Sequence, residues 1–205
     1  MKKIYVLLVV VPFLSGCDVN SEPVKEKVTV TYKVLEEVVN TKKVIKGEKL
    51  GTVYIYESNN HQSFVSEWFN NDTAVDENTI INSDVTLTGS PKSSLKLFNT
   101  PDNEYVYVNG TNHVHSDGKV VVLSQYYEKY VNIGVGAFNN NNEMKELYLP
   151  STIHQIFSNN FVDCQNLTHI YFAGSEEQWT SIPNESTIPD YVSLVFNTEF
   201  NTVSS

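Results

Sequence analysis

The sequence predicts a mostly β protein, in which a small β domain precedes a short solenoid that has short helical or irregular segments on its convex side. Two observations lead to this prediction. Apolar and polar residues alternate over residues 28–32, as in a half-buried strand. Further along, five apolar positions recur at one fixed offset, which is typical of repeat architectures.

The chain begins with a segment typical of a targeting peptide. Two lysines precede an apolar run at 4–14, and this run is too short to span a bilayer. The sequence Leu-Ser-Gly-Cys then ends at Cys17 and resembles the lipobox of bacterial lipoproteins, in which the cysteine is acylated and begins the mature chain. We therefore predict a signal peptide at 1–16 and lipidation of Cys17. The alternative is an ordinary secretory signal with an incidental cysteine.

The lipoprotein prediction implies membrane lipid as a partner and a lipid-anchored, extracytoplasmic location at the cell surface. Residues 17–27 are polar, charged and broken by Pro23, as expected of a tether. Removal of residues 1–16 takes away two lysines and no acidic residue, so the formal charge falls from −10 to −12. A surface of this charge repels nucleic-acid phosphates, and we expect no nucleic-acid partner.

Residues 28–90 are predicted to form the small mixed or all-β domain. Parts of this segment, around Gly47, Trp68 and residues 75–87, resemble the β-grasp-like module of the internalin B-repeat kind. Such modules join leucine-rich repeats in bacterial surface proteins. The glycine pair usual after the first strand is replaced here by residues 35–39. The candidate strands are 28–32, 43–45, 52–56, 64–69 and 85–88.

Turn-forming residues at 91–104, including Pro91 and Pro101, place a linker after this domain. Residues 105–205 are then predicted to form the solenoid with its caps. Within this part, the apolar runs at 105–108 and 119–123 predict a hairpin-like lead that covers the open N-terminal end of the repeats.

The repeat itself is defined by apolar residues 23 positions apart (156 − 133). Each copy contains the spacing apolar-x-x-apolar-x-apolar of a leucine-rich repeat strand. Alternate strand residues share a face, so these side chains form a core only when neighbouring coils stack, and a second aromatic ladder is expected where Phe138 meets Phe161. The repeated residues are Ile133, Phe138, Met144, Leu147 and Leu149, followed by Ile156, Phe161, Leu167, Ile170 and Phe172.

These motifs resemble the BspA-type leucine-rich repeats of bacterial surface proteins. The resemblance extends from about residue 105 to 196 and includes the closing element Gly-x-x-x-x-Trp-x-x-Ile, from Gly174 to Ile182. One departure is Asn159-Asn160 in the second copy, where the first copy has Gly136-Ala137. The resemblance implies adhesion and contact with host or community partners.

The sequence contains few candidates for reactive groups. His113-x-His115 would place two histidines on one strand face, but zinc sites use three or four ligands, so we expect solvated loop histidines. His154 and His169 are expected at exposed positions of the repeats. Cys164 lies between core positions and is predicted to be a small buried apolar residue. No known catalytic or calcium-loop spacing is present, and we predict no enzyme, metal or cofactor.

One aromatic pair stands out from this background. Tyr148 and Tyr171 are separated by the same offset as the apolar positions, and each lies between the two inward residues of its strand, beside Glu146 and His169. Tyrosine offers a large contact area at low entropic cost, and the strand faces of solenoids are common binding surfaces. We predict that these four residues bind a ligand. The alternative is a cross-strand pair that only stabilises the sheet.

Three functions follow from these observations. The first is a lipid-anchored surface module that binds an unknown extracellular protein or glycan through its repeats. The second is a structural envelope lipoprotein without a dedicated ligand. The third is an accessory subunit of a surface enzyme that uses acidic residues at the junction of the domains.

Overall fold

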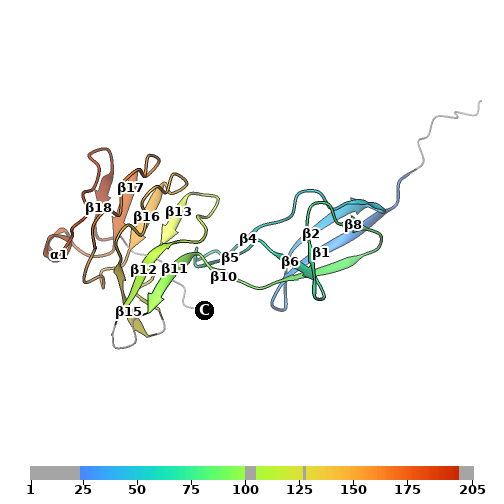
Figure 1. Cartoon of the computed structure of the whole chain (residues 1–205), viewed down its shortest axis with the longest axis horizontal. Coiled ribbons are helices and arrows are strands. Elements are labelled where there is room, and N and C mark those ends of the chain that lie inside the picture. The colour runs from blue at the N-terminus through green and yellow to red at the C-terminus, as the bar shows by residue number, and fades with distance from the viewer. Residues whose placement is uncertain (1–23, 100–104, 127, 199–205) are drawn as a thin grey trace, which may run out of the picture.

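The computed structural model describes residues 24–99, 105–126 and 128–198. The predicted signal peptide, Cys17 and most of the tether lie outside this part. The described residues form two lobes, each with its own hydrophobic core, and three short strands lie between them (Figure 1). No helix in the described part of the chain is long and apolar enough to cross a membrane.

The first lobe is a mixed five-stranded sheet in the order β2-β1-β9-β6-β7. Its central strands β1 and β9 are parallel, and the other neighbours are antiparallel. The predicted alternation in β1 is confirmed, because Val28, Val30, Tyr32 and Val34 are buried. The strands are β1 (Lys27–Val34), β2 (Glu37–Ile45), β6 (Trp68–Asn70), β7 (Thr73–Val75) and β9 (Val85–Gly89), with the small pair β3 (Glu48–Lys49) and β8 (Ile80–Ile81) beside them.

Trp68 lies at the centre of the aromatic contacts in this core. The ring of Tyr32 meets it edge-on at 4.9 Å between centroids, and the indole Nε1 donates a 2.6 Å hydrogen bond to the carbonyl of Tyr54. Gly89 is required beside these side chains, since a Cβ there would clash with a methyl carbon of Val65. The tight packing around this backbone position joins β9 to β6.

Two strand predictions in this lobe are wrong. Of the predicted strand 52–56, only Tyr56 lies in a strand, because residues 52–55 have no neighbouring strand to bond with. The predicted strand 64–69 is two strands, since Ser66 and Glu67 are exposed and interrupt it.

The connection between the lobes contains strands rather than an irregular chain. A three-stranded sheet of order β10-β5-β4 is formed by β4 (Tyr56–Glu57), β5 (Ser63–Val65) and β10 (Lys92–Ser93). Next, β11 (Leu95–Asn99) pairs with β12 (Tyr105–Thr111) of the second lobe. Thus β10 and β11 both lie in the segment that the sequence assigned to a linker.

The second lobe is a β-solenoid of about four turns, which confirms the prediction of a mostly β solenoid. One sheet has the order β13-β16-β17-β18, and every neighbouring pair in it is parallel. The opposite side has the order β11-β12-β15-β14 and continues through bridges from Ile133 to Ile156 and on to Asn184. The strands are β13 (Lys119–Val121), β14 (Gln125–Tyr126), β15 (Lys129–Ile133), β16 (Glu146–Leu149), β17 (His169–Phe172) and β18 (Ser193–Val195).

The predicted hairpin-like lead into the repeats is wrong. β12 pairs in parallel with β15, and β13 pairs in parallel with β16, so the two segments lie in different sheets. They are the two sides of the first coil, because Val108 and Val120 stack on Ile133 and Leu147 in the same way as later coils do.

Stacking of the apolar positions confirms the predicted repeat. Leu147 pairs with Ile170 and Leu149 with Phe172 in the strand register, and all four side chains are fully buried. The rings of Phe138 and Phe161 are stacked at 6.5 Å between centroids with an interplanar angle of 10°. Each coil thus completes the burial of its apolar side chains by stacking on its neighbours, as expected of a solenoid.

The last coil is closed by the single described helix, α1 (Glu176–Ser181). Ser175 caps its N-terminus, and the backbone and side chain of Gln178 complete the capping box. Trp179 is buried and meets Phe172 edge-on at 5.2 Å. A Cβ at Gly174 would lie within 2.6 Å of the Phe172 ring, which explains the glycine of the closing element.

Candidate functional site

The outward face of β13, β16, β17 and β18 brings together the four residues predicted to bind a ligand. In the register of β16 and β17, Glu146 lies opposite His169 and Tyr148 lies opposite Tyr171. Because Leu147 and Ile170 turn into the core, the four flanking residues lie on the other face of the sheet. All four are half-buried, so His169 is less exposed than the sequence predicts.

Tyr148 and Tyr171, here called the tyrosine ladder, are stacked on one another. Their ring centroids are 4.6 Å apart, with an interplanar angle of 17°. The ring of His169 is stacked on Tyr171 at 5.5 Å and 11°. Three rings on two neighbouring coils therefore form one ordered aromatic surface.

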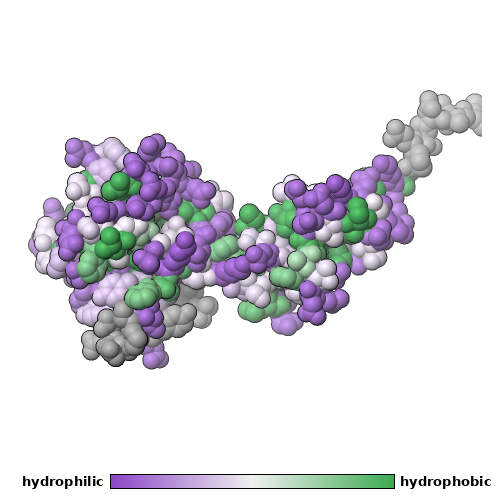
Figure 2. All heavy atoms as spheres, in the orientation of Figure 1, coloured by the Kyte–Doolittle hydropathy of each residue, from purple (hydrophilic) through white to green (hydrophobic). Residues whose placement is uncertain are grey.

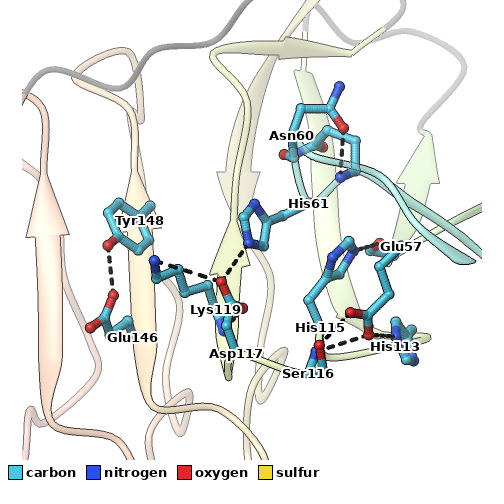
Figure 3. Close-up of polar contacts among 12 residues, drawn as sticks. Glu57, Asn60, His61, His113, His115, Ser116, Asp117, Lys119, Glu146 and Tyr148 are labelled. Carbon is cyan, nitrogen blue, oxygen red and sulfur yellow. Dashed lines mark hydrogen bonds and ion pairs between the residues drawn. The ribbon is translucent and has the colours of Figure 1, made fainter.

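The polar groups of this face are also fixed. The Tyr148 hydroxyl donates a 2.6 Å hydrogen bond to Oε2 of Glu146 (Figure 3). Burial and then this carboxylate raise the pKa of Tyr148 above its ordinary value, so the phenol remains a donor at neutral pH. On the preceding strand, Lys119 lies opposite Glu146 and extends the polar row.

This face carries groups of the kind that make contacts in interfaces. It offers ring area, a carboxylate and a phenol that is already hydrogen-bonded, and such features fix a partner's position and supply contact area. Within the residues that the structure describes, no group of three or more His, Cys, Asp or Glu side chains is arranged to hold a metal ion.

A second cluster of polar side chains was not foreseen. His61, His113 and His115, here called the junction histidine cluster, lie where the two lobes meet (Figure 3). The expectation of solvated loop histidines is wrong for His115, which is only 5% exposed, and His113 is half-buried. His113 is stacked on Phe64 of β5 at 4.5 Å, and this contact partly shields it from solvent. His154 is exposed, as predicted.

Two carboxylates bind this cluster across the junction. Glu57 accepts hydrogen bonds from the backbone N–H and the hydroxyl of Ser116 at 2.8 and 2.6 Å, and its Oε1 lies 2.7 Å from Nε2 of His113. Nε2 of His61 lies 2.9 Å from Oδ2 of Asp117. Each carboxylate and its histidine are 56 residues apart in the sequence, so no local motif could reveal the pairs.

Gln62 joins the lobes beside this cluster. Its Nε2 donates a 3.0 Å hydrogen bond to the carbonyl of Val121, on the outer edge of β13. The Tyr126 hydroxyl donates to Oε1 of the same side chain at 2.5 Å. The turn between β4 and β5 thus satisfies a carbonyl at the open edge of the first coil, which helps to protect an edge strand from pairing with other chains.

Cys164 is fully buried, as predicted. Its Sγ lies 2.9 Å from the carbonyl oxygen of Phe138, and burial raises the pKa of the thiol above its ordinary value. This thiol is therefore a core group that bridges two coils and is a poor nucleophile.

Comparisons of the chain with protein-family models, with curated proteins and with solved structures find no match.

Proposed function

We propose that the protein is a lipid-anchored, extracytoplasmic surface protein whose solenoid binds an extracellular protein or glycan. The observation that carries this proposal is the tyrosine ladder, which presents ordered rings on the face of a stacked parallel sheet. Ordered aromatic side chains lose little entropy on binding and commonly dominate interface energies. The BspA-like leucine-rich repeat motifs support the same proposal.

The surface chemistry is consistent with an extracellular binding module. On the face shown in Figure 2, hydrophilic residues predominate on both lobes and hydrophobic residues occur in small separate areas. Small, scattered apolar areas are usual for a protein that stays soluble until it meets its partner. In the first lobe, the parallel central pair β1 and β9 supports the proposal of a β-grasp-like module.

A cross-linking pull-down tests this function. The fragment from Val28 to Ser205 is incubated with envelope and host extracellular material, and bound species are recovered with and without an excess of unlabelled fragment. A surface module should capture a partner that the excess fragment displaces. Recovery that the excess does not reduce would favour the structural envelope lipoprotein instead.

A matched pair of variants then assigns the surface. Tyr148→Ser with Tyr171→Ser removes the tyrosine ladder. Tyr105→Ser with Tyr130→Ser removes a tyrosine pair that is likewise in register on adjacent parallel strands, but in the other sheet. We expect the first double variant to lose capture and the second to retain it.

A further inference from the structure

The junction histidine cluster has more imidazole rings than carboxylates. His115 lies between the other two rings, at 4.7 Å from His61 and 5.4 Å from His113 between centroids. Asp117 bonds His61 and Glu57 bonds His113, whereas the ring nitrogen of His115 bonds the Ser94 hydroxyl at 3.0 Å. Among the described residues, no carboxylate forms an ion pair with His115.

In this arrangement, a proton on His115 has a different consequence from a proton on His61 or His113. Protons on His61 and His113 would each be matched by a carboxylate in contact. A proton on His115 would instead place a third positive charge in a buried site beside the other two rings. A buried charge without a partner is strongly unfavourable, so the ring would have to move into water.

The remaining charged neighbours do not change this balance. Lys119 of β13 adds a positive charge 3.6 Å from Asp117, and its strand neighbour on β16 is Glu146. No other charged group faces the cluster in the contacts of the described residues. The charges in contact with it are thus Glu57 from β4, Asp117 from the loop before β13, and Lys119.

Moving His115 would separate the lobes. The loop that carries it also provides Ser116, whose backbone and hydroxyl are held by Glu57 of β4, and Asp117, which is held by His61. The sheet of β4 and β5 is in turn packed into the core of the first lobe through Val65 and Tyr56. We propose that the junction histidine cluster is an acid-operated latch, which holds the two lobes together at neutral pH and releases them when His115 takes up a proton.

The direction of the pH effect follows from proton linkage. Burial, and then the proximity of His61, lower the pKa of His115 below its ordinary value of about 6.5, and the nearby carboxylates of Glu57 and Asp117 offset only part of this effect. The closed form therefore binds this proton less readily than the open form. The stability of the closed form relative to the open form is therefore greatest above the ordinary histidine pKa, and it decreases as the pH falls below that value.

The carboxylates remain charged over this range. Burial would raise the pKa of Glu57, but hydrogen bonds from Ser116 and His113 outweigh it and hold the pKa below its ordinary value. In the same way, bonds from His61 and the backbone of Lys119 outweigh the burial of Asp117 and lower its pKa. Their contribution is lost only near or below about pH 4, so opening between about pH 6.5 and 5 would belong to His115.

Hydrogen exchange of the full chain in detergent micelles tests the latch. Exchange at pH 7.5 and pH 5.0 is compared after correction for the intrinsic pH dependence of amide exchange. The junction peptides are 57–63 and 113–118, and the core peptide 144–149 reports whether the solenoid remains folded. We expect the corrected exchange of the junction peptides to be at least tenfold faster at pH 5.0, with the core peptide unchanged.

Two histidine variants complete the test. In His115→Gln, the neutral amide can still bond the Ser94 hydroxyl, so the junction should be protected at both pH values. His154→Gln changes an exposed histidine outside the cluster and should behave as the parent does. A parent whose junction peptides exchange equally at both pH values would overturn the latch. So would a His115→Gln chain that is unprotected at pH 7.5 or that opens at pH 5.0 as the parent does.

Discussion

Asn160 occupies the position that Ala137 holds one coil earlier, and its side chain ties the two coils together. Its Oδ1 accepts a 2.7 Å hydrogen bond from the backbone N–H of Ala137, and its Nδ2 donates to the carbonyl of Phe157 at 2.6 Å. Asn160 is fully buried. The Asn160 side chain thus provides the hydrogen-bond acceptor for the buried N–H of Ala137, which lies outside the strands.

We predict that Asn160→Ala lowers the free energy of unfolding by about 1–3 kcal/mol, because the Ala137 N–H loses its acceptor inside the core. Urea unfolding followed by circular dichroism measures this change. The control is Asn159→Gly, since Asn159 is exposed and has a φ of 62° that glycine adopts freely. Equal stability of Asn160→Ala and the parent would mean that water or a shifted backbone replaces the lost bond.

The sequence shows that Asn159-Asn160 replaces Gly136-Ala137 in the second copy of the repeat, but it does not show the structural role of this replacement. Gly136 and Asn159 both have a φ of 62°, so asparagine fills the left-handed position that glycine fills one coil earlier. Asn140 and Asp163 share a positive φ in the same way, at 56° and 55°. The local backbone therefore repeats with the same period as the apolar positions, even where the residue types differ.

At the scale of the element, each coil depends on aromatic and aliphatic side chains that stack on those of the neighbouring coils. Phe161 is 2% exposed and stacks on Phe138. The core is a single column of coils, and a cavity in it has few other side chains that can move to fill it.

Phe161→Ala should lower the free energy of unfolding by about 3–5 kcal/mol through lost burial and the cavity left behind. The matched control is the neighbouring Val162→Ala, because Val162 is 50% exposed and should change stability by no more than about 0.5 kcal/mol. Thermal melts of both variants provide the comparison. If the two melted alike, the aromatic stack would not be a principal support of the solenoid.

The middle coils were predictable from the sequence and the outer coils were not. Leu147 and Ile170 occupy equivalent positions in the two copies of the repeat and both are apolar, so the repeat is visible. On the other side of the solenoid, the step from Val108 to Ile133 is longer than this period, and the step from Ile156 to Asn184 is longer still. Variable coil length and a polar residue at a ladder position hide the first and last coils from a search at fixed period.

At the scale of the whole molecule, the junction joins the lobes through side chains that are remote in sequence. Glu57 and Gln62 contact residues of the second lobe that are 56 or more positions away. The sequence reveals each lobe through its own local pattern. It contains no pattern for a contact between them, because that contact depends on how two separate cores are oriented.

The proposed lipid anchor would also decide how the molecule is presented at the membrane. We predict that Cys17→Ala releases the protein from the membrane fraction or leaves it unprocessed, because acyl chains provide the membrane affinity. Cell fractionation and immunoblotting measure this. Cys164→Ala is the control, since that thiol is buried in the solenoid and should not affect anchoring. A Cys17→Ala protein that is processed and membrane-bound as the parent is would refute the lipoprotein assignment.

The proposed binding role of the tyrosine ladder is tested most directly by measuring affinity and stability together for Tyr148→Ser with Tyr171→Ser. Both side chains lie outside the core on the strand face, so the free energy of unfolding should fall by only about 1–2 kcal/mol through the lost cross-strand contact. Affinity for the partner recovered by cross-linking should fall more than about tenfold, since buried aromatic anchors often contribute about 2 kcal/mol or more. The Tyr105→Ser with Tyr130→Ser control should bind as the parent does. A folded ladder variant that binds its partner with the parent's affinity would contradict the proposed site.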